Sequence, residues 1–136
     1  MRRILIAEDN DEDFVAFQRV LSRSNSATVI RCRDGEEVIN YLTKAGDGVD
    51  PRPSIILLDL NMPGTDGRET LVRLKSNSAF RSIPTVVFSS STNPNDVIYC
   101  YEQGANGYMN KPVNYVELER TLRSFLDYWE HTMVLA

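Results

Sequence analysis

The stretch Ser54-Ile55-Ile56-Leu57-Leu58-Asp59 decides the fold of this 136-residue chain. Its four consecutive apolar residues predict a strand that is buried on both faces, because a half-exposed strand would alternate polar and apolar side chains. Strands of this kind belong to parallel sheets that carry helices on both faces. The stretch ends on an acidic residue, Asp59, at the point where the strand leaves the sheet.

Short apolar runs rich in β-branched residues recur on both sides of this stretch and alternate with helical patterns. We expect strands over residues 4–7, 28–32, 54–59, 85–89 and 107–110. Asp34 and Asn95 are expected to cap helices, Gly104 to end one, and the last helix to run over about residues 114–131. This alternation predicts an α/β fold: a doubly wound, five-stranded parallel sheet of flavodoxin-like order 2-1-3-4-5 in three α/β/α layers. We expect residues 1–136 to form one domain.

The composition narrows the possible partners. Fifteen Lys and Arg against nineteen Asp and Glu leave a net charge of -4, so the chain has no general electrostatic reason to bind nucleic acid or an anionic membrane. No apolar run approaches the roughly 20 residues that span a bilayer, and the apolar run at the start is too short for a secretory signal. We therefore expect a cytoplasmic protein. Its two cysteines are expected to be free thiols, and with a single histidine they exclude a tetrahedral zinc site.

Acidic residues end two strands that the predicted order makes neighbours. Glu8 and Asp9 end the first strand and Asp59 ends the third, so their carboxylates are expected to meet at one edge of the sheet. Like charges about 4 Å apart repel by ~4 kcal/mol at an effective dielectric of 20, so the cluster requires a cation. Oxygen ligands at an open site favour Mg²⁺. The following acids are interpreted only as first-turn helix residues favoured by the helix dipole: Asp11, Glu12 and Asp13.

A lysine and a serine are predicted to reach the same edge. Lys111 ends the fifth strand and Ser89 ends the fourth. An ammonium can pair with Asp59 and with a dianion placed on it, and a hydroxyl can donate to a phosphoryl oxygen. Together with carboxylates and Mg²⁺ they form a minimal set for holding a phosphoryl group in line with an attacking oxygen.

These motifs resemble the receiver domains of two-component response regulators. The resemblance is carried by Glu8-Asp9, the run from Leu58 to Gly67, Ser89-Ser90, and Gly104 through Lys111-Pro112, and it covers nearly the whole chain. It implies the following roles: Asp59 as the phosphoacceptor, Lys111 and Ser89 as phosphoryl contacts, Tyr108 as the aromatic switch, and Asp9, Asp59, the carbonyl of Asn61 and, through water, Glu8 as the Mg²⁺ site. It also implies a cis peptide bond before Pro112.

The resemblance implies partners as well. The phosphoryl donor would be a phosphohistidine of a sensor histidine kinase, and the protein would be a stand-alone response regulator rather than an enzyme, signalling through the face of the fourth helix, fifth strand and fifth helix. The chain is also similar to small regulators that partner bacterial phytochromes, in its loop over residues 45–53 and its ending over residues 125–129. Surplus apolar residues near the end predict a homodimer through the C-terminal helix region: Tyr115, Phe125, Leu126, Tyr128, Trp129, Met133, Val134 and Leu135.

Three other functions compete with this interpretation. A phosphatase with an Asp nucleophile and Mg²⁺ needs a second Asp two residues after the first, where this chain has Asn61. A flavodoxin shares the strand order, but here the loop after the first strand is acidic over residues 8–13 and would repel the FMN phosphate. A receiver-like interaction module that works without phosphorylation would not need Asp9, Asp59, Ser89 and Lys111 together, although their presence does not exclude a constitutive role.

Overall fold

Five parallel strands form the central sheet, in the order β2-β1-β3-β6-β7. The computed structural model describes residues 2–23, 27–62 and 64–133. The elements along the chain are β1 (Arg2–Ala7), α1 (Asp11–Ser22), β2 (Ala27–Cys32), α2 (Gly35–Gly46), β3 (Ile55–Leu58), β4 (Asn61–Met62), β5 (Thr65–Asp66), α3 (Gly67–Ser76), β6 (Thr85–Ser89), α4 (Pro94–Glu102), β7 (Gly107–Asn110), α5 (Tyr115–Leu126) and the π-helical η1 (Asp127–Thr132). The predicted order 2-1-3-4-5 is confirmed, since only the small hairpin β4–β5 changes the numbering.

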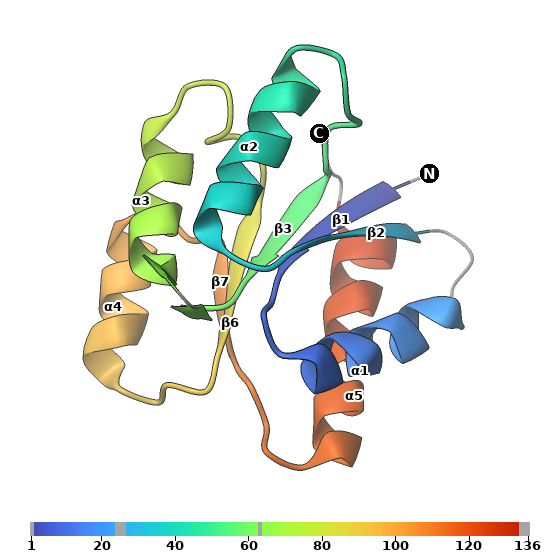
Figure 1. Cartoon of the computed structure of the whole chain (residues 1–136). Helices are drawn as coiled ribbons and strands as arrows, with labels where there is room; N and C mark the ends of the chain where they lie inside the picture. Colours follow the sequence, from blue (N-terminus) through green and yellow to red (C-terminus); the bar gives the residue numbers. More distant parts are fainter. Residues whose placement is uncertain (1, 24–26, 63, 134–136) are drawn as a thin grey trace.

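The all-apolar strand β3 is buried on both faces, as its sequence predicts. Ile56 and Leu58 point into a core shared with α2, α3 and α4, whereas Ile55 and Leu57 point into a second core shared with α1 and α5. Figure 1 shows the two groups of helices on opposite faces of the sheet. Because each fully buried Leu or Ile contributes about 1.5–3 kcal/mol, both layers hold the sheet in place.

Side-chain caps fix where the helices begin. Asp34 accepts a hydrogen bond from the amide of Glu37, which confirms it as the N-cap of α2. The prediction of Asn95 as the cap of α4 is wrong: Asn93 is the N-cap, and Pro94 takes the first helical position. Proline suits that position because its fixed φ is already helical and the amide it lacks would have no partner inside the helix.

A two-stranded hairpin, β4–β5, follows the central strand and was not predicted. Gly64 at its turn has a φ of 70°, which favours glycine. Gly67 then starts α3 against the backbone of the preceding loop, where a Cβ atom would lie 2.4 Å from the Asp59 carbonyl oxygen and 2.5 Å from the Leu60 Cα. The absence of a side chain at Gly67 therefore lets α3 begin directly beside Asp59.

Part of the apolar surface that the sequence predicted for a homodimer is buried in the protein's own core. Phe125 and Leu126 belong to the core, and Trp129 packs partly against it, whereas Tyr128 stays 49% exposed. The predicted helix is confirmed, although its last part, η1, is π-helical. Val134 and Leu135 lie outside the described residues. Over the ranges that the structure describes, no helix combines the length and the hydropathy needed to cross a membrane.

Candidate functional site

The carboxyl ends of β1, β3 and β7 bring two acids and a lysine together. Lys111 Nζ lies 2.6 Å from Glu8 Oε1 and 2.9 Å from Asp59 Oδ2. Backbone hydrogen bonds extend the sheet to this point, because the Asp59 amide donates to the Ala7 carbonyl at 3.1 Å and the Lys111 amide to the Ser89 carbonyl at 2.8 Å. The predicted meeting of Glu8, Asp59 and Lys111 at one edge is therefore present.

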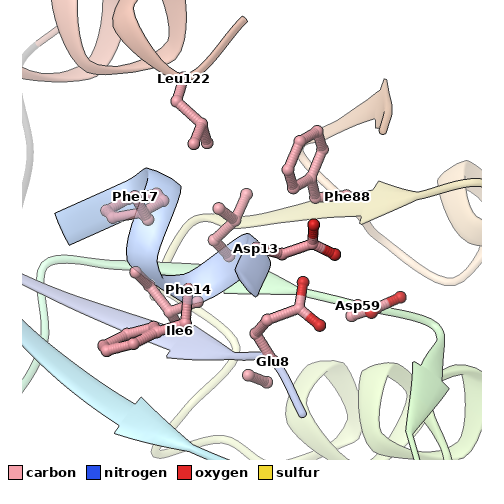
Figure 2. Close-up of a pocket in the computed structure, with 10 residues that line it drawn as sticks. Ile6, Glu8, Asp13, Phe14, Phe17, Asp59, Phe88 and Leu122 are labelled. Atoms are coloured by element: carbon pink, nitrogen blue, oxygen red, sulfur yellow. The ribbon is translucent and has the colours of Figure 1, made fainter. Parts of the chain in front are cut away.

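A third carboxylate, from Asp13 on α1, completes the shell around the lysine. Its Oδ2 atom lies 3.0 Å from Lys111 Nζ. Figure 2 shows the carboxylates of Glu8, Asp13 and Asp59 gathered in one region. The sequence interpretation of Asp13 as only a first-turn residue missed this contact. The available signal was its spacing of four residues from Phe17, which is buried on the same face of the helix.

Burial controls the electrostatics of this cluster. Glu8 and Asp59 are each only 5% exposed, and the pocket below them is lined by Phe14, Phe17, Phe88 and Leu122, as Figure 2 shows. Burial raises the pKa of Glu8 to about 7, opposed by its hydrogen bond to Lys111 and reinforced by the charge of Asp59. Burial lowers the pKa of Lys111, but the hydrogen bonds and charges of Glu8 and Asp59 outweigh it and raise that pKa above its ordinary value.

The second oxygen of each buried acid is held by the backbone. Asp59 Oδ1 accepts from the amide of Asn61 at 3.0 Å, and Glu8 Oε2 accepts from the amide of Asn10 at 3.2 Å. Both carboxylates are therefore fixed at two points, one charged and one neutral. This arrangement orients Asp59 before any ligand arrives.

The residues predicted to bind metal line one open pocket at this edge: Glu8, Asp9, Asp59 and Asn61. All of them offer oxygen, which hard divalent ions prefer. In the described part of the chain, no three His, Cys, Asp or Glu residues are grouped so as to hold a metal ion. Lys111 already contacts both Glu8 and Asp59. The oxygen donors of this pocket are therefore of the type that a divalent ion takes, and such an ion would share the carboxylates of Glu8 and Asp59 with Lys111.

Arg31, at the end of β2, supports the acidic loop and was not predicted. Its Nε donates to the Glu8 carbonyl at 3.1 Å and its Nη2 to the Asp9 carbonyl at 3.2 Å. The guanidinium also pairs with Asp11 at 2.8 Å and lies over the ring of Phe14. An arginine gives no sequence signal for this role, because the contact depends on how β2 aligns with β1.

Ser89 and Tyr108 both form hydrogen bonds with Ser91 in the loop after β6, and not with the carboxylates. Ser89 is fully buried, and its Oγ accepts from the amide of Ser91 at 3.1 Å. The hydroxyl of half-buried Tyr108 donates to the carbonyl of the same Ser91 at 3.0 Å. The hydroxyl of Ser91 in turn donates to Asp96 of α4, whose carboxylate is 2.7 Å from Arg68 Nη2 of α3. Ser89, the predicted phosphoryl contact, and Tyr108, the predicted aromatic switch, thus both bond to Ser91, and the hydroxyl of Ser91 bonds to α4.

The peptide bond between Lys111 and Pro112 is trans, so the cis bond expected from the resemblance is wrong for this structure. The trans form is favoured before proline by roughly 0.5–1 kcal/mol. Lys111 reaches its carboxylate partners with this trans bond in place.

The strand order of this doubly wound sheet reverses between β1 and β3, and an oriented aspartate, a lysine and further acids lie at that point. This combination defines a class of signalling proteins, the phosphoacceptor receivers. Residues 4–123 match the response regulator receiver domain family, and the chain belongs to that family.

Two response regulators of nearly the same length are among the similar proteins. The chain is 38% identical over 134 residues to the response regulator Rcp1 of Synechocystis, covering 97% of this chain and 91% of Rcp1. Among solved structures, the Mn²⁺-bound form of Rcp1 matches with a TM-score of 0.94 at 37% identity, covering 100% of this chain and 99% of that one. The phosphorylated cyanobacterial phytochrome response regulator RcpA matches with a TM-score of 0.92 at 36% identity, covering 98% and 97%.

Family membership settles the general function. The chain is a response regulator receiver, a signalling protein rather than an enzyme, and its partner is a histidine kinase. Receivers bind a divalent metal ion, as the Mn²⁺-bound Rcp1 structure illustrates.

Proposed function

We propose that Asp59 accepts a phosphoryl group from a phosphohistidine of a sensor histidine kinase, in the cytoplasm. The observation that carries this proposal is the orientation of Asp59 by Lys111 at one oxygen and the Asn61 amide at the other. An oxygen of Asp59 attacks phosphorus, the bond from phosphorus to the histidine nitrogen breaks, and that nitrogen keeps the electron pair. Water later attacks the phosphorus and loses a proton to solvent, the bond from phosphorus to the Asp59 oxygen breaks, and inorganic phosphate leaves the regenerated carboxylate.

The other predicted residues take supporting roles in this proposal. Lys111 donates to the phosphoryl oxygens and offsets their charge, and Ser89 donates a hydrogen bond to them after leaving the Ser91 amide. Tyr108 turns inward once its bond to the Ser91 carbonyl is released. Mg²⁺ would be held by Asp9, Asp59, the carbonyl of Asn61 and, through water, Glu8, and when bound it would supply charge neutralisation for the transferring group.

Labelling with acetyl phosphate and Mg²⁺ tests the acceptor. Intact-protein mass spectrometry should find one phosphoryl group on the wild type and none on Asp59→Asn, because an amide is not a nucleophile at neutral pH. Asp47→Asn is the matched control, since Asp47 is an exposed carboxylate after α2, and it should be labelled like the wild type. Equal labelling of Asp59→Asn and the wild type would refute the assignment.

We propose that the donor kinase is of the phytochrome type. This rests on the similarity to Rcp1 and to the phytochrome response regulator RcpA. Phosphotransfer from a phosphorylated bacterial phytochrome kinase should be faster than transfer from kinases without a phytochrome sensor. Faster transfer from any of the latter would contradict this partner.

We also propose that two copies associate through the C-terminal helix region. Tyr115 and Tyr128 are 39% and 49% exposed there, and the Tyr128 ring stands edge-on to Trp129 with centroids 5.3 Å apart. Sedimentation should show Tyr128→Ala shifted towards monomer. Val49→Ala removes apolar surface from a residue that is 71% exposed after α2, and it should leave the mass unchanged. A wild-type monomer at all concentrations would end the dimer proposal.

A further inference from the structure

Asp13 contributes a contact to the site that none of the proposed roles uses. The ammonium of Lys111 has three hydrogens, and three carboxylates accept from it: Glu8 at 2.6 Å, Asp59 at 2.9 Å and Asp13 at 3.0 Å. Glu8 and Asp59 follow strands, whereas Asp13 reaches in from the first turn of α1, as Figure 2 shows. Lys111 therefore has no hydrogen left for a further acceptor unless one of these bonds breaks.

The three acceptors differ in how firmly they are held. The side chains of Glu8 and Asp59 are 6% and 7% exposed, and each has a second oxygen bonded to a backbone amide. The Asp13 side chain is 24% exposed, and among the hydrogen bonds of the described residues its carboxylate has Lys111 alone as donor. Asp13 can return to water when it releases the lysine, whereas a buried carboxylate cannot. Its bond is therefore the least costly of the three to give up.

We propose that Asp13 is a positioning residue that holds Lys111 while Asp59 is unmodified and competes with the phosphoryl group for the lysine's third hydrogen. This inference rests on the proposed phosphorylation of Asp59. When a phosphoryl group occupies Asp59, Lys111 leaves Asp13 and donates to a phosphoryl oxygen, while Asp13 is rehydrated. Asp13 thus sets how readily the lysine becomes available.

The direction of the effect follows from charge. Asp13→Asn keeps the size of the side chain but replaces a hydrogen bond between two charged groups with a weaker one between the lysine and a neutral amide oxygen. It also removes a negative charge from the pocket that an anionic phosphoryl donor must enter. Both changes favour the phosphoryl group, and we expect the loss of the acceptor's charge to correspond to about fivefold in affinity. The backbone amide of Asp13, which donates to the N-cap Asn10, is unchanged by this substitution.

The experiment compares wild type, Asp13→Asn and Glu12→Gln. Glu12 is the adjacent acid in the same helical turn and is exposed, so its variant matches the change in net charge without touching Lys111. Calorimetric titration with beryllofluoride in Mg²⁺ measures affinity for a phosphoryl analogue. Phosphorylation rates at increasing acetyl phosphate concentration separate KM from the maximal rate. Asp13→Asn should bind beryllofluoride about fivefold more tightly and lower KM, with a maximal rate close to wild type.

The outcomes separate this inference from the proposed function. If Asp13→Asn matches Glu12→Gln in both measurements, Asp13 is only a helix-turn charge and the inference is wrong. Weaker beryllofluoride binding by Asp13→Asn would also overturn it, since Asp13 would then assist the phosphoryl group. If the wild type itself is neither labelled at Asp59 nor binds beryllofluoride, the proposed function fails, and the role of Asp13 fails with it.

Discussion

Replacing Lys111 by methionine removes the cation at the centre of the carboxylate cluster while keeping its aliphatic stem. Three carboxylate oxygens lie 2.6 to 3.0 Å from its Nζ atom. Oxygens that share one such neighbour are within about 6 Å of each other, and at an effective dielectric of 20 each pair repels by about 3 kcal/mol. Protonation and water entry limit the total, so we expect Lys111→Met to lower the free energy of unfolding by about 3–5 kcal/mol near pH 8.

The loss should depend on pH with a defined sign. The pKa of Glu8 is raised to about 7 from an unfolded value of 4.5. The stability that this group contributes is therefore complete below pH 4.5 and is lost as the pH rises through about 7. Without the lysine hydrogen bond that holds the Glu8 pKa down, this window moves upward. Lys111→Met should therefore regain stability, relative to the wild type, on going from about pH 8 to about pH 5.5.

Urea unfolding followed by circular dichroism at both pH values measures this, with Lys75→Met as the matched control. The Lys75 ammonium also has three acceptors, but all are neutral: the carbonyls of Arg81 and Ile83 and the side chain of Asn106. Its replacement should cost stability equally at the two pH values. If both variants show the same pH dependence, the repulsion argument is refuted.

Three further substitutions test the supports of the site. Gly67→Ala should lower the free energy of unfolding by about 1–3 kcal/mol and slow acetyl phosphate labelling, because the added Cβ would lie 2.4 Å from the Asp59 carbonyl oxygen. Gly46→Ala is the control, since a Cβ there meets nothing within 4 Å, and it should change neither stability nor labelling. Equal losses in the two variants would contradict the clash. Arg31→Gln should weaken Mg²⁺ binding in calorimetry by releasing the carbonyls of Glu8 and Asp9, and unchanged affinity would contradict it. Asp96→Asn should loosen the loop after β6, seen as faster amide exchange at Ser91, whereas wild-type protection there would show that Asp96 does not hold it.

The candidate site divides into residues that the sequence could predict and residues that it could not. Glu8, Asp59 and Lys111 each directly follow a strand, and the carboxyl ends of parallel strands meet at one edge, so the strand order predicts that they lie close together. Asp13 and Arg31 reach the same place from a helix and a neighbouring strand. Their contacts depend on side-chain direction and on the alignment of β2 with β1, which a pattern of residue types does not encode.

The apolar pattern of the chain predicted the layers, because a strand such as β3 with no polar face must be covered on both sides. The strand order needed, in addition, the general rules for crossover connections in parallel sheets. The sequence also predicted which acids lie at the carboxyl ends of the strands, namely Glu8 and Asp59. Only the tertiary structure decided which carboxylates accept hydrogen bonds from Lys111, because that depends on the distance and burial of each side chain. It likewise decided that Phe125 and Leu126 belong to the chain's own core, because burial depends on which surfaces meet and not on hydrophobicity.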